Sequence, residues 1–299
     1  MGLDDVFYEA LKNKYYKDEE VINKSTKGTK YYLNREIYEK ELNDMCPKIR
    51  ACFEEADGQE LTEKMSSIAS SSRLSYVLFK DYVNSGFVSD CFTSKKEKYK
   101  VIFEGKLRIK EINSTPNIDV VLISKETVVF IEVKMKEIYS TNSRDFSPKY
   151  KEVLKRMFPN LTINSKQVIR DNNEVEKIYI EELEQFKIYD FAQTIKHFLG
   201  IQNFIDNSND SNCQAELINN MTGEESVKYQ KGMKIVFANL FYDPNELVSE
   251  RLTKRYQSLL NQLNTDIIPL FESGNNVIPV IDKVPIKWMI IDQYSINKD

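Results

Sequence analysis

At 299 residues the chain is long enough to bury a core of its own and sits at the upper edge of a single α/β domain, so we expect one domain with helical additions. Hydrophobic residues at 41% and charged residues at 29% exclude a disordered or fibrous protein, and a formal net charge of −4 excludes a positive field over the whole surface. The single histidine leaves little room for triad hydrolases or His-rich zinc sites, so catalysis must rely on carboxylates, lysines or hydroxyls.

The sequence carries no sign of a membrane or secreted destination. It has no run of the ~18 to 20 consecutive apolar residues that a membrane helix needs. Its first residues lack the basic and then apolar pattern of a signal peptide. Its four cysteines form no Cys-x-x-Cys pair, and we interpret them as reduced, structural thiols. We therefore predict a cytoplasmic protein that binds no membrane.

The first part of the sequence predicts helices. Residues 1–58 are rich in Lys, Glu and Tyr, which favours a helical arm packed on the body, and we assign no chemistry to this arm. Residues 59–299 form the predicted core domain. Apolar residues recur at helical spacing over residues 60–83, and residues 84–86 supply an end. We expect one helix there, interrupted by the small residues 70–72.

A period of two replaces the helical period between residues 99 and 134. Four segments alternate in this way and predict strands, at residues 101–103, 106–112, 118–123 and 128–134. The dipeptide Glu104-Gly105 lies between the first two segments and predicts a tight turn. We expect these strands to form the centre of a sheet.

The remaining sequence alternates polar excursions with further elements. Residues 140–178 are polar with a short helical pattern at 150–157, and residues 202–232 form an Asn-, Ser- and Gln-rich connection. Between them a long helix is predicted at 179–199, ended by Gly200. A strand at 234–242, a helix at 245–263 and a final strand at 286–291 follow. This order predicts an α/β fold in which helices cover both faces of the sheet.

Charged residues converge in the two strands at the centre of this sheet. Side chains alternate along a strand, so Glu132 and Lys134 point to the same face while Val133 points away. Pairing the strands so that residue 124 meets residue 127 places Asp119 directly across from Glu132. Two carboxylates and an amine therefore meet on one patch of two otherwise apolar strands.

Such a patch is unfavourable unless something neutralises it. An unpaired buried charge costs on the order of several kcal/mol, and neighbouring carboxylates repel. A divalent cation removes the conflict, because Mg²⁺, or Mn²⁺ in its place, takes one or two protein carboxylates, waters and a phosphate oxygen. Lys134 would orient or deprotonate the attacking water, or stabilise charge on the phosphate. The pattern indicates phosphodiester hydrolysis; the competing interpretation is a solvated ion pair at the strand ends.

The same residues carry a resemblance to a known superfamily. Pro116-Asn117-Ile118-Asp119 followed by Glu132-Val133-Lys134 resembles the signature of the PD-(D/E)XK nucleases, in the variant with two residues between the Pro and the Asp. Segments at 65–72, 132–137, 196–200 and 239–244 together are similar to a bacterial family assigned as restriction endonucleases, and the likeness covers roughly residues 60–295. It implies a restriction-endonuclease-like fold, a mixed central sheet flanked by helices, with Asp119 and Glu132 as metal ligands and Lys134 as the catalytic amine.

The resemblance also implies a glutamine near the metal. Many nucleases of this superfamily carry a Gln on the helix after the strand with the Lys, and Gln193 fits this place best, with Gln185 as the alternative. Both belong to a stripe at four-residue steps that includes Tyr189 and His197. The polar edge of an amphipathic helix would give the same stripe, so both interpretations stay open.

One expected acidic residue has no clear counterpart. Some members of the superfamily place it on the first core helix, where this sequence has residues 70–73. Glu63, Glu104 and Glu111 are the candidates to replace it. The number of metal ions therefore stays open.

A row of basic residues lies next to the proposed site in the sequence. Residues 95–110 hold seven basic residues against two acidic ones. Lys106, Arg108 and Lys110 alternate with apolar residues, so a strand would present them on one face, where they would contact nucleic-acid phosphates. A merely solvated strand face is the competing interpretation.

Three hypotheses follow. The first is a Mg²⁺-dependent endodeoxyribonuclease that cuts DNA in restriction or defence, as a homodimer and with a cognate methyltransferase encoded nearby. The second is a catalytically degenerate nuclease fold that binds DNA or a protein without cutting. The third is an RNA or single-strand nuclease on the same fold. The sequence leaves the recognition site and the strandedness of the substrate open.

Overall fold

The fold is taken from a computed structural model of the chain. It describes residues 1–26, 28–56, 60–62, 64–90, 92–93, 95–139, 145–157, 159, 161–170, 172–184, 190–206, 217–218, 230, 232–262, 265 and 286–291. Within these ranges no helix is both long enough and apolar enough to cross a membrane.

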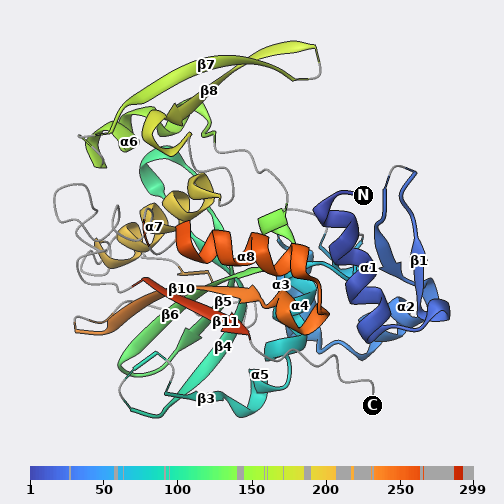
Figure 1. The fold of residues 1–299 in the computed structure, drawn as a ribbon. Coiled ribbons are helices and arrows are strands. Elements are labelled where there is room, and N and C mark those ends of the chain that lie inside the picture. The colour runs from blue at the N-terminus through green and yellow to red at the C-terminus, as the bar shows by residue number, and fades with distance from the viewer. Residues whose placement is uncertain are drawn as a thin grey trace.

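A seven-stranded mixed sheet forms the centre of the molecule (Figure 1). Its order is β11 (Ile286–Ile291), β10 (Lys234–Tyr242), β6 (Thr127–Lys134), β5 (Asn117–Ile123), β4 (Glu97–Leu107) and β3 (Phe87–Ser89), with β9 (Leu217–Ile218) also paired to β4. β10 is parallel to β6 and β11, whereas neighbours among β6, β5, β4 and β3 are antiparallel. All of β6 is buried, as a strand covered on both faces must be. The expected α/β fold with a mixed, helix-flanked sheet is confirmed.

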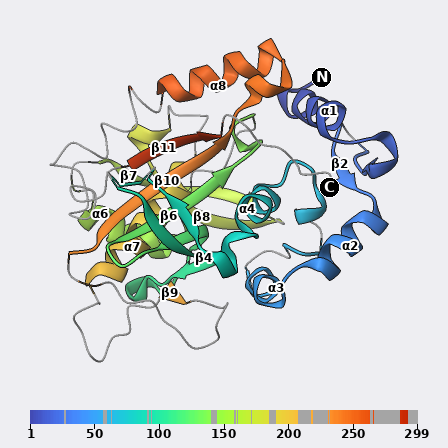
Figure 2. The ribbon, with the colours of Figure 1, turned by 90° about the horizontal axis from the view of Figure 1, so that it is seen from below.

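Helices pack on both sides of the sheet (Figure 2). They are α1 (Leu3–Tyr15), α2 (Arg35–Asp44), α3 (Pro47–Glu54), α4 (Ser71–Phe79), α5 (Tyr82–Ser85), α6 (Lys151–Met157), α7 (Phe191–Asp206) and α8 (Glu250–Gln262). Helix α7 places Phe198 and Phe204 against Phe237 and Phe130 on one face. Helix α3 packs on Phe103, whose register directs it to the opposite face.

The N-terminal region packs against the end of β10. It contains α1, α2, α3 and a short hairpin of β1 (Val21–Asn23) and β2 (Tyr31–Leu33). The hydroxyls of Tyr15 and Tyr242 are hydrogen-bonded at 2.8 Å. The ring of Phe7 lies 5.0 Å from that of Tyr139 and 6.0 Å from that of Tyr242. The region is mainly helical, as its composition predicts.

The helix expected over residues 60–83 is wrong in its first half. Residues 64–66 form a 3₁₀ turn, and α4 begins only at Ser71. The Ser70 hydroxyl oxygen accepts a hydrogen bond from the Arg73 backbone N–H at 3.2 Å, which is the contact of a helix N-cap. The serines therefore begin the helix, where we expected them to interrupt a longer one.

The tight turn expected at Glu104-Gly105 is also wrong. β4 continues through both residues, with Phe103 paired to Val120 and Gly105 paired to Ile118. The strand ends at Leu107, so the expected strand at 106–112 is cut short, and residues 110–112 form a 3₁₀ turn. Polar Glu104 broke the apolar pattern because it belongs to a polar site inside the sheet.

The segment between β6 and α7 holds a hairpin that the sequence did not predict. β7 (Ile163–Arg170) pairs with β8 (Asn173–Ile180), so the helix expected from residue 179 is wrong at its start. Its end is wrong as well, because α7 runs through Gly200 to Asp206. A Cβ at Gly200 would lie 2.6 Å from Leu107 Cβ. Gly200 is thus required by close packing of α7 on β4 and does not end the helix.

The remaining predicted elements agree with the structure. The strands expected at 118–123, 128–134, 234–242 and 286–291 are β5, β6, β10 and β11 within one residue at each end. The short helical pattern at 150–157 is α6, preceded by the 3₁₀ turn Pro148–Tyr150. The helix expected at 245–263 is α8, preceded by a 3₁₀ turn at Pro244–Leu247. These elements carry the clearest apolar periodicity.

Candidate active site

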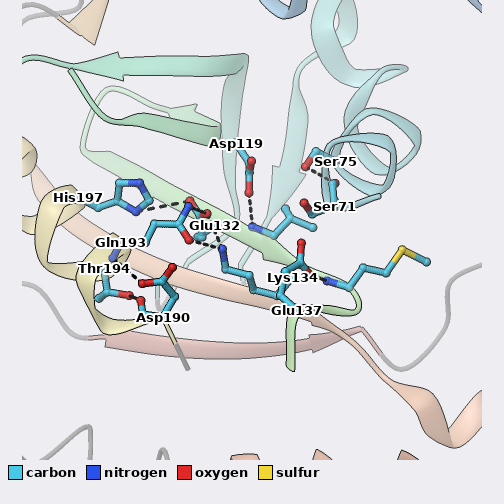
Figure 3. Close-up of polar contacts among 12 residues, drawn as sticks. Ser71, Ser75, Asp119, Glu132, Lys134, Glu137, Asp190, Gln193, Thr194 and His197 are labelled. Carbon is cyan, nitrogen blue, oxygen red and sulfur yellow. Dashed lines mark hydrogen bonds and ion pairs between the residues drawn. The ribbon is translucent and has the colours of Figure 1, made fainter. Parts of the chain in front are cut away.

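The register between β5 and β6 is the one that the sequence predicts. Val120 pairs with Ile131, and Ile123 with Val128, which continues to Asp119 across from Glu132. The Ser124 hydroxyl oxygen accepts hydrogen bonds from the turn at 3.1 and 2.9 Å and so fixes the connection. The two carboxylates consequently come from neighbouring strands (Figure 3).

Two side chains, those of Lys134 and Gln193, converge on one oxygen of Glu132. Lys134 Nζ lies 2.8 Å from Glu132 Oε1 and 2.6 Å from Gln193 Oε1. Gln193 Nε2 donates to the same Glu132 oxygen at 2.5 Å. The structure therefore brings together Glu132, Lys134 and Gln193 (Figure 3), whereas the alternative Gln185 lies outside the described residues.

Helix α7 holds Gln193 in its first turn. The Asp190 carboxylate accepts a hydrogen bond from the Gln193 backbone N–H at 3.0 Å, which is a cap for the start of the helix. One turn later His197 presents Nδ1 at 3.5 Å from Glu132 Oε2. Burial lowers the pKa of His197, although Glu132 acts in the opposite direction, so the ring is neutral at neutral pH. No role was predicted for His197, although its place in the stripe with Gln193 was a signal that could have pointed to one.

Lys134 is the charged amine of the site. Burial opposes its charge, but Glu132, Glu137 and Asp119 surround it, and its pKa is raised above the ordinary value for lysine. Glu137 is held in place because one of its carboxylate oxygens accepts from the Met135 backbone N–H at 2.7 Å. Lys134 is therefore an ammonium group that can stabilise negative charge, and it is poorly suited to accept a proton.

Glu104 adds a third carboxylate beside Asp119. It lies between the pairs Phe103–Val120 and Gly105–Ile118, which puts it across from Asp119 in β5. Its backbone is left-handed, with φ of 48°, a conformation that is strained for a non-glycine residue. Burial and then the Asp119 charge raise the pKa of Glu104. Burial and then the Glu132 charge raise that of Asp119.

The other two candidates for the additional acidic residue do not join this cluster. Glu111 is in the 3₁₀ turn after β4, where it forms an ion pair at 2.5 Å with Arg156. Glu63 lies outside the described residues. Glu60, which the sequence did not single out, faces the site and accepts hydrogen bonds from Lys64 and Ser72, both at 2.7 Å. Glu104 is thus the additional carboxylate that the fold places in the site.

Each of the two central carboxylates keeps one oxygen available. Asp119 Oδ2 accepts from the Val133 backbone N–H at 2.7 Å. Glu132 Oε2 is buried and receives no hydrogen bond from the described residues. Within those residues no group of three or more His, Cys, Asp or Glu side chains already stands in a metal-binding arrangement. A Mg²⁺ ion needs only one or two protein carboxylates, because waters and a phosphate oxygen complete its shell.

A pocket of about 510 Å³ opens above these residues. Asp119, Glu132, Lys134 and Gln193 form one part of its lining, and Ser70–Ser72 at the start of α4 form another. The N-terminal region contributes the residues that the sequence missed, namely Tyr8, Lys30 and Tyr32, and Lys64 and Lys136 add further positive charge. Lys136 lies over the Tyr8 ring, with its Nζ 5.2 Å from the centroid. A region to which we assigned no chemistry therefore walls the site.

The basic row expected at Lys106, Arg108 and Lys110 does not form a strand face. Of the three, only Lys106 is in β4, because the strand ends at Leu107. Lys106 Nζ lies 3.7 Å from a Glu55 carboxylate oxygen. Lys110 belongs to the following 3₁₀ turn. The regular alternation on which the expectation rested is therefore absent, and the proposed phosphate contacts of these residues stay a prediction.

Comparisons with known proteins assign no function to the chain. No family model matches the chain, and no curated protein or solved structure shows significant similarity to it. The function must therefore be inferred from the opposed carboxylates, the charged lysine and the glutamine that line the pocket, with the histidine beside Glu132.

Proposed function

We propose that the protein is a Mg²⁺-dependent endodeoxyribonuclease with a restriction-endonuclease-like core. The observation that carries the proposal is the placement of Asp119 across from Glu132, with Lys134 and Gln193 converging on the same Glu132 oxygen. The mixed sheet agrees with the fold that the resemblance to PD-(D/E)XK nucleases implies. Sequence signature and spatial arrangement thus support the same class of enzyme.

The donor set fits a divalent cation. Asp119 and Glu132 would hold it through the oxygens that Val133, Lys134 and Gln193 leave free. Glu104 would stand beside them as an additional ligand or as a partner of bound water. When bound, the cation supplies the positive charge that polarises the scissile phosphate and activates a water. A hard cation with oxygen ligands suits these carboxylates, and Mn²⁺ would substitute for Mg²⁺.

The protein's own groups have separate tasks. Lys134, charged at neutral pH, stabilises the negative charge that develops on the phosphate oxygens during attack by water. Gln193 holds both Lys134 and Glu132 and so fixes their relative orientation. Lys30 and Lys136, which also line the pocket, would contact the phosphates that flank the scissile bond.

Plasmid cleavage tests the proposal. Purified protein is expected to nick supercoiled DNA with Mg²⁺ or Mn²⁺ and to be inactive with EDTA. Glu132→Gln and Lys134→Met should each lower the rate by about 10²-fold or more, because each removes a charge at the reacting phosphate. Glu126→Gln, in the exposed turn between β5 and β6, is the matched control and should cut like the wild type. Activity that survives in both site variants, with the fold intact by thermal unfolding, would remove this site.

One observation favours a second function, a nuclease fold that binds DNA without cutting it. Lys134 and Gln193 already donate hydrogen bonds to one oxygen of Glu132, and the described residues hold no ready-made metal site. Calorimetric titration with Mn²⁺ separates the two functions, since a binding module need bind no ion at Asp119 and Glu132. Plasmid, linear duplex and RNA substrates compared side by side separate a DNA endonuclease from an RNA or single-strand nuclease.

The biological setting is proposed from the resemblance alone. Restriction or defence would require action on both strands of DNA, for which a homodimer is the simplest arrangement. A methyltransferase encoded next to this protein would protect the host DNA. Sedimentation of the purified protein and inspection of the neighbouring genes would test these two expectations.

A further inference from the structure

The hairpin of β7 and β8 separates its charges by face. It projects beyond α7 at the edge of the molecule (Figure 1). Lys166 pairs with Lys177 across the two strands, so alternation puts both lysines and Tyr179 on one face. Glu174 and Glu176 lie on the other face. We call the face formed by Lys166, Lys177 and Tyr179 the lysine face.

The pairing of two lysines is unfavourable without a partner, because like charges directly opposite each other destabilise a strand pair. Lys166 is compensated: its Nζ lies 2.8 Å from Asp145 Oδ1, 3.8 Å from Glu184 Oε1 and 4.8 Å from the Tyr179 ring centroid. Lys177 forms no ion pair with any residue that the structure describes. Among the described residues, Lys177 is therefore the lysine of this face that lacks an acidic partner.

Two further lysines lie on aromatic rings at the base of the hairpin. Phe146 forms a β-bridge with Ile178 of β8, which joins this base to the hairpin. Lys196 Nζ lies 5.7 Å from the ring centroids of both Phe146 and Tyr150. Lys149 Nζ lies 5.8 Å from the centroid of the same Tyr150 ring. Two cations thus share one aromatic platform.

Lys196 connects this platform with the candidate active site. It lines a cavity of about 260 Å³ together with Asp119. Burial lowers the pKa of Lys196, and the nearby charges of Lys177 and Lys149 add to this against the opposing effect of Asp190. The cations therefore follow one another from the carboxylates of the site to the hairpin.

We propose that the lysine face, with Lys149 and Lys196, binds the phosphate backbone of double-stranded DNA where it leaves the catalytic pocket. The proposal rests on the proposed nuclease function and adds the surface that holds the substrate. Several cations in sequence, continuous with the reacting centre and separated from the acidic face of the hairpin, are complementary to a regularly charged polyanion. Contacts of this kind position the duplex and carry no sequence preference.

Binding measured without cleavage tests this surface. Fluorescence anisotropy with a labelled duplex, with Ca²⁺ in place of Mg²⁺, gives the affinity of the full chain at several salt concentrations. Lys149→Gln combined with Lys177→Gln should weaken binding roughly tenfold and lower the salt slope by about 1.8, because each lost phosphate contact contributes about 0.9. The charge-matched control combines Lys155→Gln and Lys254→Gln, exposed lysines on α6 and α8.

The control pair should bind like the wild type. The Lys149→Gln/Lys177→Gln variant should show equally weakened binding to two duplexes of unrelated sequence. Equal binding by both double variants, failure of the wild type to bind duplex DNA, or binding restricted to RNA would overturn the proposal. Plasmid nicking by the same proteins keeps the two proposals apart. If the protein nicks plasmid but the Lys149→Gln/Lys177→Gln variant binds DNA like the wild type, only the proposed binding surface is wrong. If binding depends on these lysines but no protein nicks plasmid, only the nuclease function is wrong.

Discussion

At the scale of single residues, Glu104 shows how a site residue can be hidden by its own pattern. A glutamate next to a glycine inside an apolar run is typical of a turn. In the fold it lies within β4, across from Asp119, with a left-handed backbone. The sequence predicted Asp119, Glu132 and Lys134 because their register depends only on two adjacent strands and a short turn. The places of Glu104 and His197 in the site depend on which strand pairs with β5 and which helix packs on the sheet. The alternation of residues within one segment does not specify either.

The raised pKa of Glu104 predicts a pH dependence of stability. The folded protein keeps this proton to a higher pH than the unfolded chain, so it binds more protons between the two pKa values, and stability falls as pH rises through that window. Glu104→Gln removes the buried charge. The variant should be more stable than the wild type at neutral pH in EDTA, and the gain should vanish below the ordinary glutamate pKa.

Urea unfolding between pH 4 and pH 8 measures this difference. The matched control is Glu111→Gln, because the Arg156 side chain lowers the pKa of exposed Glu111, and its contribution therefore has the opposite sign. The control should be slightly less stable than the wild type at neutral pH and should converge with it in acid. A Glu104→Gln variant whose stability runs parallel to the wild type at all pH values would show that Glu104 is not a buried charge.

At the scale of elements, strands with a buried face were predictable and the exposed hairpin was not. β6 and β10 are almost wholly buried, and β5 buries Ile118 and Val120–Leu122, so their apolar runs identify them. β7 and β8 form a two-stranded ribbon outside the central sheet, whose residues are largely half-buried or exposed. Their polar sequence lacks apolar residues at a period of two. The last residues of β8, from residue 179, were instead assigned to the start of the expected helix.

The contact of α7 with β4 gives a prediction at this scale. Gly200→Ala places a Cβ against Leu107, and overpacking of this kind costs ~1–3 kcal/mol. Alanine also gains ~1 kcal/mol in helix propensity over glycine. We expect a net loss of up to about 2 kcal/mol in urea unfolding and a lower cleavage rate, since α7 carries Gln193. Ser258→Ala on an exposed turn of α8 should instead gain a few tenths of a kcal/mol, about as propensity alone predicts. A stabilised Gly200→Ala protein would show that the two elements do not pack closely.

At the scale of the whole molecule, the N-terminal region is part of the site and not an appendage. Tyr8, Lys30 and Tyr32 line the pocket that Asp119 and Glu132 also line. Nothing in residues 1–58 taken alone indicates this, because the residues become functional only when the region folds back on the sheet. Its composition predicted the helices, whereas its part in lining the pocket follows only from its tertiary contacts. The contribution of these contacts to the free energy of unfolding can be measured with variants of the residues that make them.

The Arg73 side chain is one of the groups that attach the N-terminal region to the core. From α4 in the core it forms a salt bridge with Glu41 on α2, and the two side chains are 8% and 19% exposed. Its charge also acts on Tyr16, the residue after α1. Glu41→Gln leaves a largely buried guanidinium without its carboxylate, which should cost about 3 kcal/mol of unfolding free energy and reduce cleavage by loosening the pocket wall. Glu54→Gln removes the carboxylate of the exposed Arg50–Glu54 pair and should cost only about 0.5 kcal/mol. Equal losses in the two variants would mean that the Arg73–Glu41 pair does not hold the N-terminal region to the core.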